Sequence, residues 1–251
     1  MSVSVYNFAD FTILGVNNPA AQPKNIKTAV TEVTVQQQRS KYMKMKFARI
    51  CAIAVVALAV LPAQAASLVD GDAEAGKAKS ITCSACHGAS GNSISPLWPN
   101  IAGQSAKYIV AQLKAFKTGK RTNPLMTSQA MLLSDEDMLN LAVFFETLPA
   151  AAQAVADPAL INRAEALFRG GNAEEGIAAC IACHGPTGRG NPAAAYPALN
   201  GQHAAYTAKQ LNDYASGARK SDGATRIMRQ IAERLSADDI EALASYIQGL
   251  K

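Results

Sequence analysis

The pentapeptide CSACH at residues 83–87 decides the fold of this chain, and it recurs as CIACH at residues 180–184. Cys-x-x-Cys-His is the attachment motif of a c-type haem, in which two thiols bond to the porphyrin and the histidine binds iron. On a helix, positions i, i+3 and i+4 share one face, so the three side chains can reach one haem. The two motifs therefore predict two covalently bound haem c groups.

The motifs name six residues that hold these groups. The haem-attaching thiols are predicted to be Cys83, Cys86, Cys180 and Cys183, and the iron-binding imidazoles His87 and His184. A zinc half-site is the first alternative, but zinc requires a second ligand pair, and neither half has another cysteine. A redox dithiol is the second alternative, but it calls for βαβ patterning, which neither half shows.

The net positive charge of the 251-residue chain comes from its first 65 residues. Residues 1–65 hold seven basic and two acidic side chains, which account for the formal net charge of +5. Residues 66–251 hold 17 of each and are neutral overall. This balance argues against a nucleic-acid partner, because no excess positive charge attracts phosphates.

The segment 43–65 has the pattern of a secretory signal peptide. Lys44, Lys46 and Arg49 precede an apolar stretch at residues 50–61, and Ala-Gln-Ala at 63–65 forms a small-x-small cleavage site. The apolar stretch is short for a membrane span of about 20 residues. Residues 1–42 are polar and irregular, and we expect a disordered upstream extension before a true start at Met43. The mature protein is therefore predicted to be periplasmic.

The remainder of the chain is a tandem duplication. The segment 98–104 matches 196–202 at an offset of 98, and 134–137 matches 236–239 at an offset of 102. The same alignment pairs Tyr108 with Tyr206 and Gln112 with Gln210. We therefore expect a first domain at residues 66–149, an Ala-rich linker at 150–158 and a second domain at 159–251.

The sequence of each half predicts helices and no strands. The expected helices cover 72–86, 105–117 and a segment from Ser134 in the first half, and 161–183, 204–214 and a segment from Ser236 in the second. Ser134 and Ser236 precede acidic residues and apolar residues at helical spacing, which is typical of a capped helix start. Each half has under about 100 residues, so a protein-only core would be marginal and haem is expected to complete it.

Two methionines are candidates for the sixth position of each iron. Met126 lies eight residues before Ser134, and Met228 lies eight residues before Ser236, so the duplication superposes them. This match favours iron ligation over simple core packing. Met131 aligns with Glu233 and is the second candidate in the first half.

Five further residues lie near the predicted sites. His203 is expected to be a solvated histidine at a helix start. The carbonyl groups of Pro99 and Pro197 are expected to accept the second N–H of the ligating histidines. The matched pair Arg121 and Arg219 is expected near the haem propionates or at the domain interface.

The motifs resemble a known family. Pro-x-Leu/Ile-x-Gly after Cys-x-x-Cys-His is similar to class I cytochromes c, and GQHAAYTAKQL at 201–211 with ASYIQGL at 244–250 resembles the dihaem cytochrome c4 family. The resemblance covers roughly residues 68–251. It implies an all-α fold of two tandem class I cytochrome c domains related by a pseudo-twofold axis, with His/Met ligation of both irons.

The resemblance also implies a function. It implies a periplasmic electron carrier, soluble or loosely associated with the membrane, between a quinol-oxidising complex and a haem-copper terminal oxidase. Two other classes stay open. One is a haem subunit of a larger oxidoreductase such as a flavocytochrome sulfide dehydrogenase. The other is a dihaem peroxidase, which needs an iron with an open position, and two matched methionines argue against it.

Overall fold

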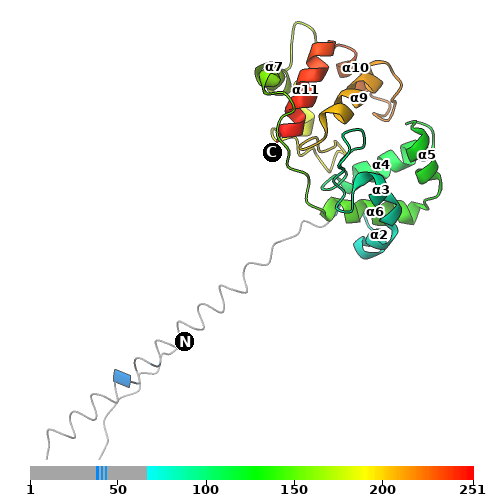
Figure 1. Cartoon of the computed structure of the whole chain (residues 1–251), viewed down its shortest axis with the longest axis vertical. Coiled ribbons are helices and arrows are strands. Elements are labelled where there is room, and N and C mark those ends of the chain that lie inside the picture. The colour runs from blue at the N-terminus through cyan, green and yellow to red at the C-terminus, as the bar shows by residue number, and fades with distance from the viewer. Residues whose placement is uncertain (1–37, 40, 42, 44–66) are drawn as a thin grey trace, which may run out of the picture. The chain divides into compact units, whose positions relative to one another are not determined.

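The computed structural model describes residues 38, 39, 41, 43 and 67–251, and in the latter range helices are joined by irregular segments (Figure 1). The first half holds α2 (Ala73–Lys79), α3 (Ile81–His87), α4 (Ala106–Lys117), α5 (Pro124–Met131) and α6 (Asp135–Thr147). The second half holds η1 (Pro158–Leu160), α7 (Ile161–Gly170), α8 (Ile181–His184), α9 (Ala204–Ala215), α10 (Ile227–Ala232) and α11 (Ala237–Gly249). In residues 67–251, β-structure is limited to two isolated bridges. The all-α prediction is confirmed.

The last helix of each half begins as the sequence predicts. The Ser134 hydroxyl accepts from the Asp137 amide at 3.0 Å, and the Asp137 carboxylate accepts from the Ser134 amide at 2.9 Å. Ser236 and Asp239 form the same capping box at α11. Because each box satisfies two backbone N–H groups that the helix leaves unpaired, both helices start at a defined residue.

These two helices form the centre of each half. Helices α2 and α4 pack on α6, and α7 and α9 pack on α11. The buried apolar side chains of α6 include Met138, Leu141, Phe144 and Phe145, and those of α11 include Ile240, Leu243 and Ile247. Burying one such side chain contributes about 1.5–3 kcal/mol. The apolar periodicity that predicted these helices therefore also identified the core.

The structure differs from the predicted helices at three places. The expected helix 161–183 ends at Gly170 as α7, and residues 171–180 are non-helical before α8 begins at Ile181. The expected helix 72–86 is two helices, because Ser80 ends α2 with its amide bonded to Lys77 O and then begins α3. In addition, α5 and α10 were not predicted. Helix α5 begins where the Asn123 side chain accepts from the Met126 amide at 3.0 Å, with Pro124 at the first helical position.

The predicted signal peptide and upstream extension lie outside the described residues, apart from positions 38, 39, 41 and 43. Residues 65–251 form one compact unit, to which the contacts between the two halves belong. No helix in the described part of the chain is both long and apolar enough to cross a bilayer.

Gly76 of α2 is predicted to be essential to the packing of the first half. A methyl group there would overlap the backbone carbonyl of Asn140 in α6, which cannot move without shifting the helix. We expect Gly76→Ala to lower the free energy of unfolding by about 2 kcal/mol or more, measured by chemical denaturation of the holoprotein.

Gly170 at the end of α7 provides the matched control. A methyl group there would meet nothing within 4 Å. Gly170→Ala should therefore leave stability unchanged or raise it by about 0.5–1 kcal/mol through helix propensity. Equal destabilisation by both substitutions would contradict the packing argument.

Candidate functional site

The two Cys-x-x-Cys-His motifs lie on short helices that line one cavity of about 1060 Å³. Helix α3 carries the first motif, and Cys180 caps the start of α8, which carries the second. All four cysteines are half-buried and free of disulfides. The cavity is lined mainly by apolar atoms and by both sets of motif residues.

Burial opposes a redox role for the first thiol of each motif. Burial raises the pKa of Cys83, and it raises the pKa of Cys180 to about 11. A catalytic Cys-x-x-Cys pair needs the opposite shift, towards the reactive thiolate. Within the described residues, no cluster of three or more His, Cys, Asp or Glu side chains could hold a metal ion by itself. Both non-haem alternatives therefore lack support.

The motif histidines are fixed by proline carbonyls, as the sequence predicts. His87 Nδ1 lies 2.9 Å from Pro99 O, and His184 Nδ1 lies 2.9 Å from Pro197 O. Since a carbonyl only accepts, each Nδ1 donates and each Nε2 keeps its lone pair in the neutral ring. Burial lowers the pKa of both histidines, although the carbonyl contacts oppose that shift. A neutral ring with a free Nε2 is the form that binds a metal.

The matched methionines lie at the same cavity. Met126 on α5 and Met228 on α10 both line it. Met131, the second candidate in the first half, ends α5 with 57% of its surface exposed and does not line the cavity. Position in the cavity thus separates Met126 from Met131.

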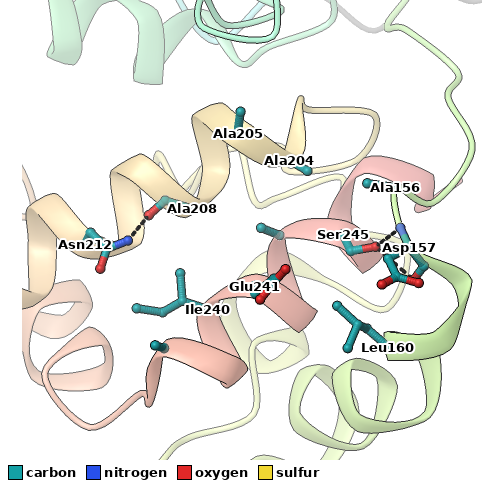
Figure 2. Close-up of a pocket in the computed structure, with 12 residues that line it drawn as sticks. Ala156, Asp157, Leu160, Ala204, Ala205, Ala208, Asn212, Ile240, Glu241 and Ser245 are labelled. Carbon is teal, nitrogen blue, oxygen red and sulfur yellow. Dashed lines mark hydrogen bonds between the residues drawn. The ribbon is translucent and has the colours of Figure 1, made fainter.

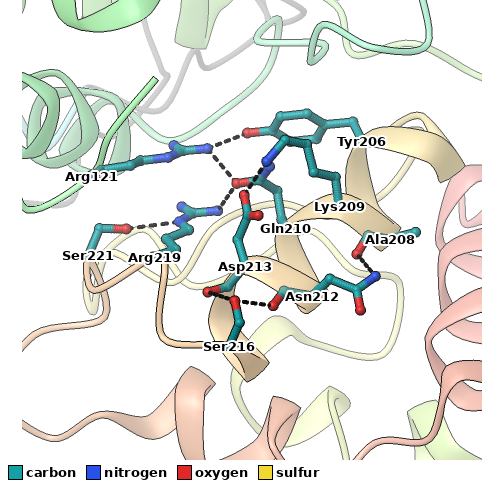
Figure 3. A network of polar contacts seen from close by, with 10 residues as sticks. All are labelled: Arg121, Tyr206, Ala208, Lys209, Gln210, Asn212, Asp213, Ser216, Arg219 and Ser221. Carbon is teal, nitrogen blue, oxygen red and sulfur yellow. Dashed lines mark hydrogen bonds and ion pairs between the residues drawn. The ribbon is translucent and has the colours of Figure 1, made fainter. Parts of the chain in front are cut away.

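Two arginines contact residues of the opposite half, and Figure 3 shows the contacts of Arg121. Arg121 of the first half donates to the Tyr206 hydroxyl at 2.6 Å and to Gln210 Oε1 at 2.8 Å. Arg219 of the second half donates to the Tyr108 hydroxyl at 2.7 Å and to Gln112 Oε1 at 2.9 Å. These reciprocal contacts follow the pseudo-twofold relation of the two domains. The expectation that both arginines lie at the domain interface is confirmed.

The arginine pair carries positive charge that the protein does not neutralise. Each of Gln112 Oε1 and Gln210 Oε1 accepts from both guanidinium groups, so two like charges meet at shared neutral acceptors. Arg121 is 8% exposed and Arg219 is 4% exposed, and neither pairs with a carboxylate in the described part of the chain. Burial alone would raise the pKa of Tyr108, but the two guanidinium groups hold it below its usual value.

These features fit a haem that is held by thioether bonds. Buried charge is costly unless an opposite charge accompanies it, and both arginines line the cavity that the motifs share. Haem c brings an apolar ring for the cavity, vinyl carbons for the thiols and carboxylates for buried cations. The thiols, the neutral imidazoles and the guanidinium groups would hold it, which agrees with the donor set that the sequence predicts.

The prediction for His203 is wrong. Its ring is buried, with 8% of its surface exposed, and its Nε2 donates to Ser93 O of the first half at 2.9 Å. The contact joins residues 110 positions apart, so the local helix-start pattern contained no sign of it. The tyrosines and glutamines of the arginine network were visible in the self-alignment, but their role depends on contact between the halves.

A second, smaller cavity of about 360 Å³ lies on the second half between α9, α11 and the linker (Figure 2). Alanines make up half of its lining, and its linker residue Asp157 is tied to Ser245 by two backbone contacts of 2.7 and 3.1 Å. It contains no histidine, cysteine or arginine. It is separate from the haem-binding cavity.

Comparison with known proteins agrees with this site. The sequence model of the cytochrome c family matches residues 73–149 and 172–251. The chain is 49% identical over 180 residues to cytochrome c4 of Pseudomonas aeruginosa, covering 72% of this chain and 89% of that protein. The crystal structure of reduced recombinant cytochrome c4 from Pseudomonas stutzeri matches with a TM-score of 0.71 at 47% identity, covering 72% of this chain and all of that one.

A second group of relatives is named for a different role. A thiosulfate dehydrogenase electron acceptor of Stutzerimonas stutzeri is 39% identical over 174 residues, covering 66% of this chain and 77% of that protein. Two haem-attachment motifs, two matching domain segments and the cytochrome c4 relatives agree with one another. The chain therefore belongs to the cytochrome c4 family of electron-transfer proteins and carries two covalently bound haem c groups.

Proposed function

We propose that this chain is a periplasmic electron carrier in which each iron is held by one histidine and one methionine. His87 and Met126 would serve the first haem, and His184 and Met228 the second. The observation that carries the proposal is that both matched methionines line the cavity shared by the two motif histidines. The pattern at residues 43–65 supports export, since it combines a basic segment, an apolar stretch and a cleavage site.

Methionine ligation favours a carrier over an enzyme. A haem supplies reversible one-electron transfer, and a thioether ligand raises its reduction potential relative to a second histidine. A side chain at the sixth position also keeps substrates such as peroxide from the iron. The histidine and methionine ligands would thus fill both axial positions of each iron and leave electron exchange with other proteins as its function.

We propose one donor and acceptor pair and one alternative donor. The first candidates are a quinol-oxidising complex as donor and a haem-copper terminal oxidase as acceptor. A specific observation favours a second donor, because one relative is named as the electron acceptor of thiosulfate dehydrogenase. The neutral charge balance of residues 66–251 leaves docking to local surface chemistry rather than to a global field.

Electron delivery can be tested directly. We expect the reduced holoprotein to be oxidised rapidly by membranes containing a haem-copper oxidase, followed by stopped-flow absorbance. The oxidised holoprotein should be reduced by a quinol-oxidising complex, or by thiosulfate dehydrogenase with thiosulfate if the second donor applies. If the oxidase failed to oxidise the reduced holoprotein and the holoprotein turned over peroxide rapidly, the protein would be a peroxidase and the carrier proposal would be wrong.

The methionine ligands can be tested by matched substitutions. Met228→Ala should open the second iron to water, lower its potential and remove half of the weak long-wavelength band that reports Met–iron bonding. Met126→Ala should do the same to the first iron. Met131→Ala is the control and should leave the band intact. Loss of the band in Met131→Ala, with Met126→Ala unaffected, would show that the first ligand is misassigned.

The buried arginine pair should tune the haems and stabilise the interface. Arg219→Gln removes donors to Tyr108 and to both shared glutamines, and a buried acceptor that loses its donor costs about 1–3 kcal/mol. Loss of a buried positive charge should also lower a haem potential, because that charge favours the reduced state. Denaturation and redox titration measure the two effects.

Arg169→Gln serves as the control for this charge. Arg169 is half exposed, and its partner Glu165 lies one turn away on the same helix. We expect no resolvable change in stability or potential, because solvent screens such a pair. Equal haem reduction potentials in Arg219→Gln and the wild type would contradict the prediction that the arginine pair affects the haems.

A further inference from the structure

The interface between the halves has a symmetric frame. Gln202 donates to Asn100 O at 2.8 Å and accepts from the Asn100 amide at 2.9 Å. Gln104 makes the same two contacts with Ala198, each at 2.9 Å. These reciprocal contacts show that residues 100 and 198 occupy equivalent places, so the two sides of the interface can be compared position by position.

One side of this frame holds a cluster of three buried polar side chains: Ser93, Asn100 and His203. His203 Nε2 donates to Ser93 O at 2.9 Å. The Asn100 side chain accepts from the Ser93 amide and donates to Gly201 O, both at 2.8 Å. The Ser93 backbone is therefore held on its carbonyl side by the second half and on its amide side by Asn100.

The other side of the frame lacks all three side chains. Ala198 replaces Asn100, and Ser105 replaces His203 with nearly the same backbone angles (φ −53°, ψ 129° against φ −55°, ψ 132°). Ser93 lies two residues after Gly91, and the second half has Gly190 two residues after Gly188. The Ser105 hydroxyl is buried without a hydrogen-bond partner.

The cluster continues to the first haem-attachment motif. The single proton of the Ser93 hydroxyl is shared between Cys86 O at 3.0 Å and Ser95 O at 3.1 Å, and Cys86 directly precedes His87 of the first motif. A chain of two hydrogen bonds thus joins His203 of the second half to the backbone of the first motif. On the other side, the Gly190 amide donates to His184 O of the second motif at 2.8 Å. The buried Ser105 hydroxyl has no hydrogen-bond partner, so no side chain of the first half extends this link across the interface.

We propose that His203 is a positioning residue for the first haem, acting across the interface through Ser93. Its effect is crossed and one-sided: a side chain of the second half sets the surroundings of the haem in the first. Hydrogen bonds around a haem ligand tune the potential of the iron, so the two haems would differ because of this contact. The proposal does not depend on which proteins supply or receive electrons.

The test places the residue of the other half at this position. His203→Ser keeps the backbone that Ser105 already adopts, so the start of α9 should form normally. We expect the midpoint potential and paramagnetically shifted proton resonances of the first haem to move, while those of the second stay at wild-type values. The Ser93 amide should also exchange faster with deuterium, because its segment loses an anchor.

Three further single variants and one double variant separate this contact from general packing. His203→Gln keeps an N–H donor at the reach of Nε2 and should restore the wild-type values. Ser105→Ala removes only an unpaired hydroxyl and should change neither haem. Ser93→Gly should reproduce the shift of His203→Ser, and the double variant should add little to either, because both act through one chain.

Three outcomes would overturn the proposal. The first is a shift of the second haem alone or of both haems equally in His203→Ser. The second is no shift of the first haem. The third is that His203→Gln behaves like His203→Ser, which would assign the effect to the packing of the ring rather than to its hydrogen bond.

Discussion

Two buried guanidinium groups that share their acceptors impose the constraint on which the interface depends. Arg121 and Arg219 come from different halves, yet both donate to Gln112 and Gln210. Like charges in a low-dielectric setting repel unless an anion is present. A carboxylate-bearing group in the cavity, such as a haem propionate, would offset this repulsion and so stabilise the contact between the halves.

The tandem duplication explains how such an interface arises from a single sequence pattern. Gln104 and Gln202 occupy equivalent positions in the two repeats, and each contacts the backbone of the other half. A residue type that is repeated in this way makes two contacts across the pseudo-twofold axis. The backbone adds one contact between the halves that has no symmetric counterpart, in which the Lys220 amide donates to Lys120 O. One repeated residue type therefore stabilises both sides, and only positions that differ between the repeats can distinguish the two haems.

The sequence predicted local features well and contacts between the halves poorly. The starts of α6 and α11 were predictable, because Ser134 and Ser236 carry their capping partners three residues away. The proline carbonyls were also predictable, since Pro99 and Pro197 follow the histidines closely. His203 was mispredicted because its partner is remote in sequence. Helices α5 and α10 were missed because each is too short to show a clear apolar periodicity.

The two methionine helices show how equivalent positions are reached by different local means. Asn123 and Pro124 begin α5 directly before Met126. The longer segment before Met228 instead places Arg226 in the left-handed region, with φ 55°, and ties Asp222 to Arg229 through a nearly buried ion pair at 2.8 Å. A buried pair needs well-placed hydrogen bonds to offset its desolvation, and Asp222 provides one by also accepting from the Arg229 amide at 3.0 Å. The extra residues are therefore held by charge, so the second half can differ in length without displacing its methionine from the cavity.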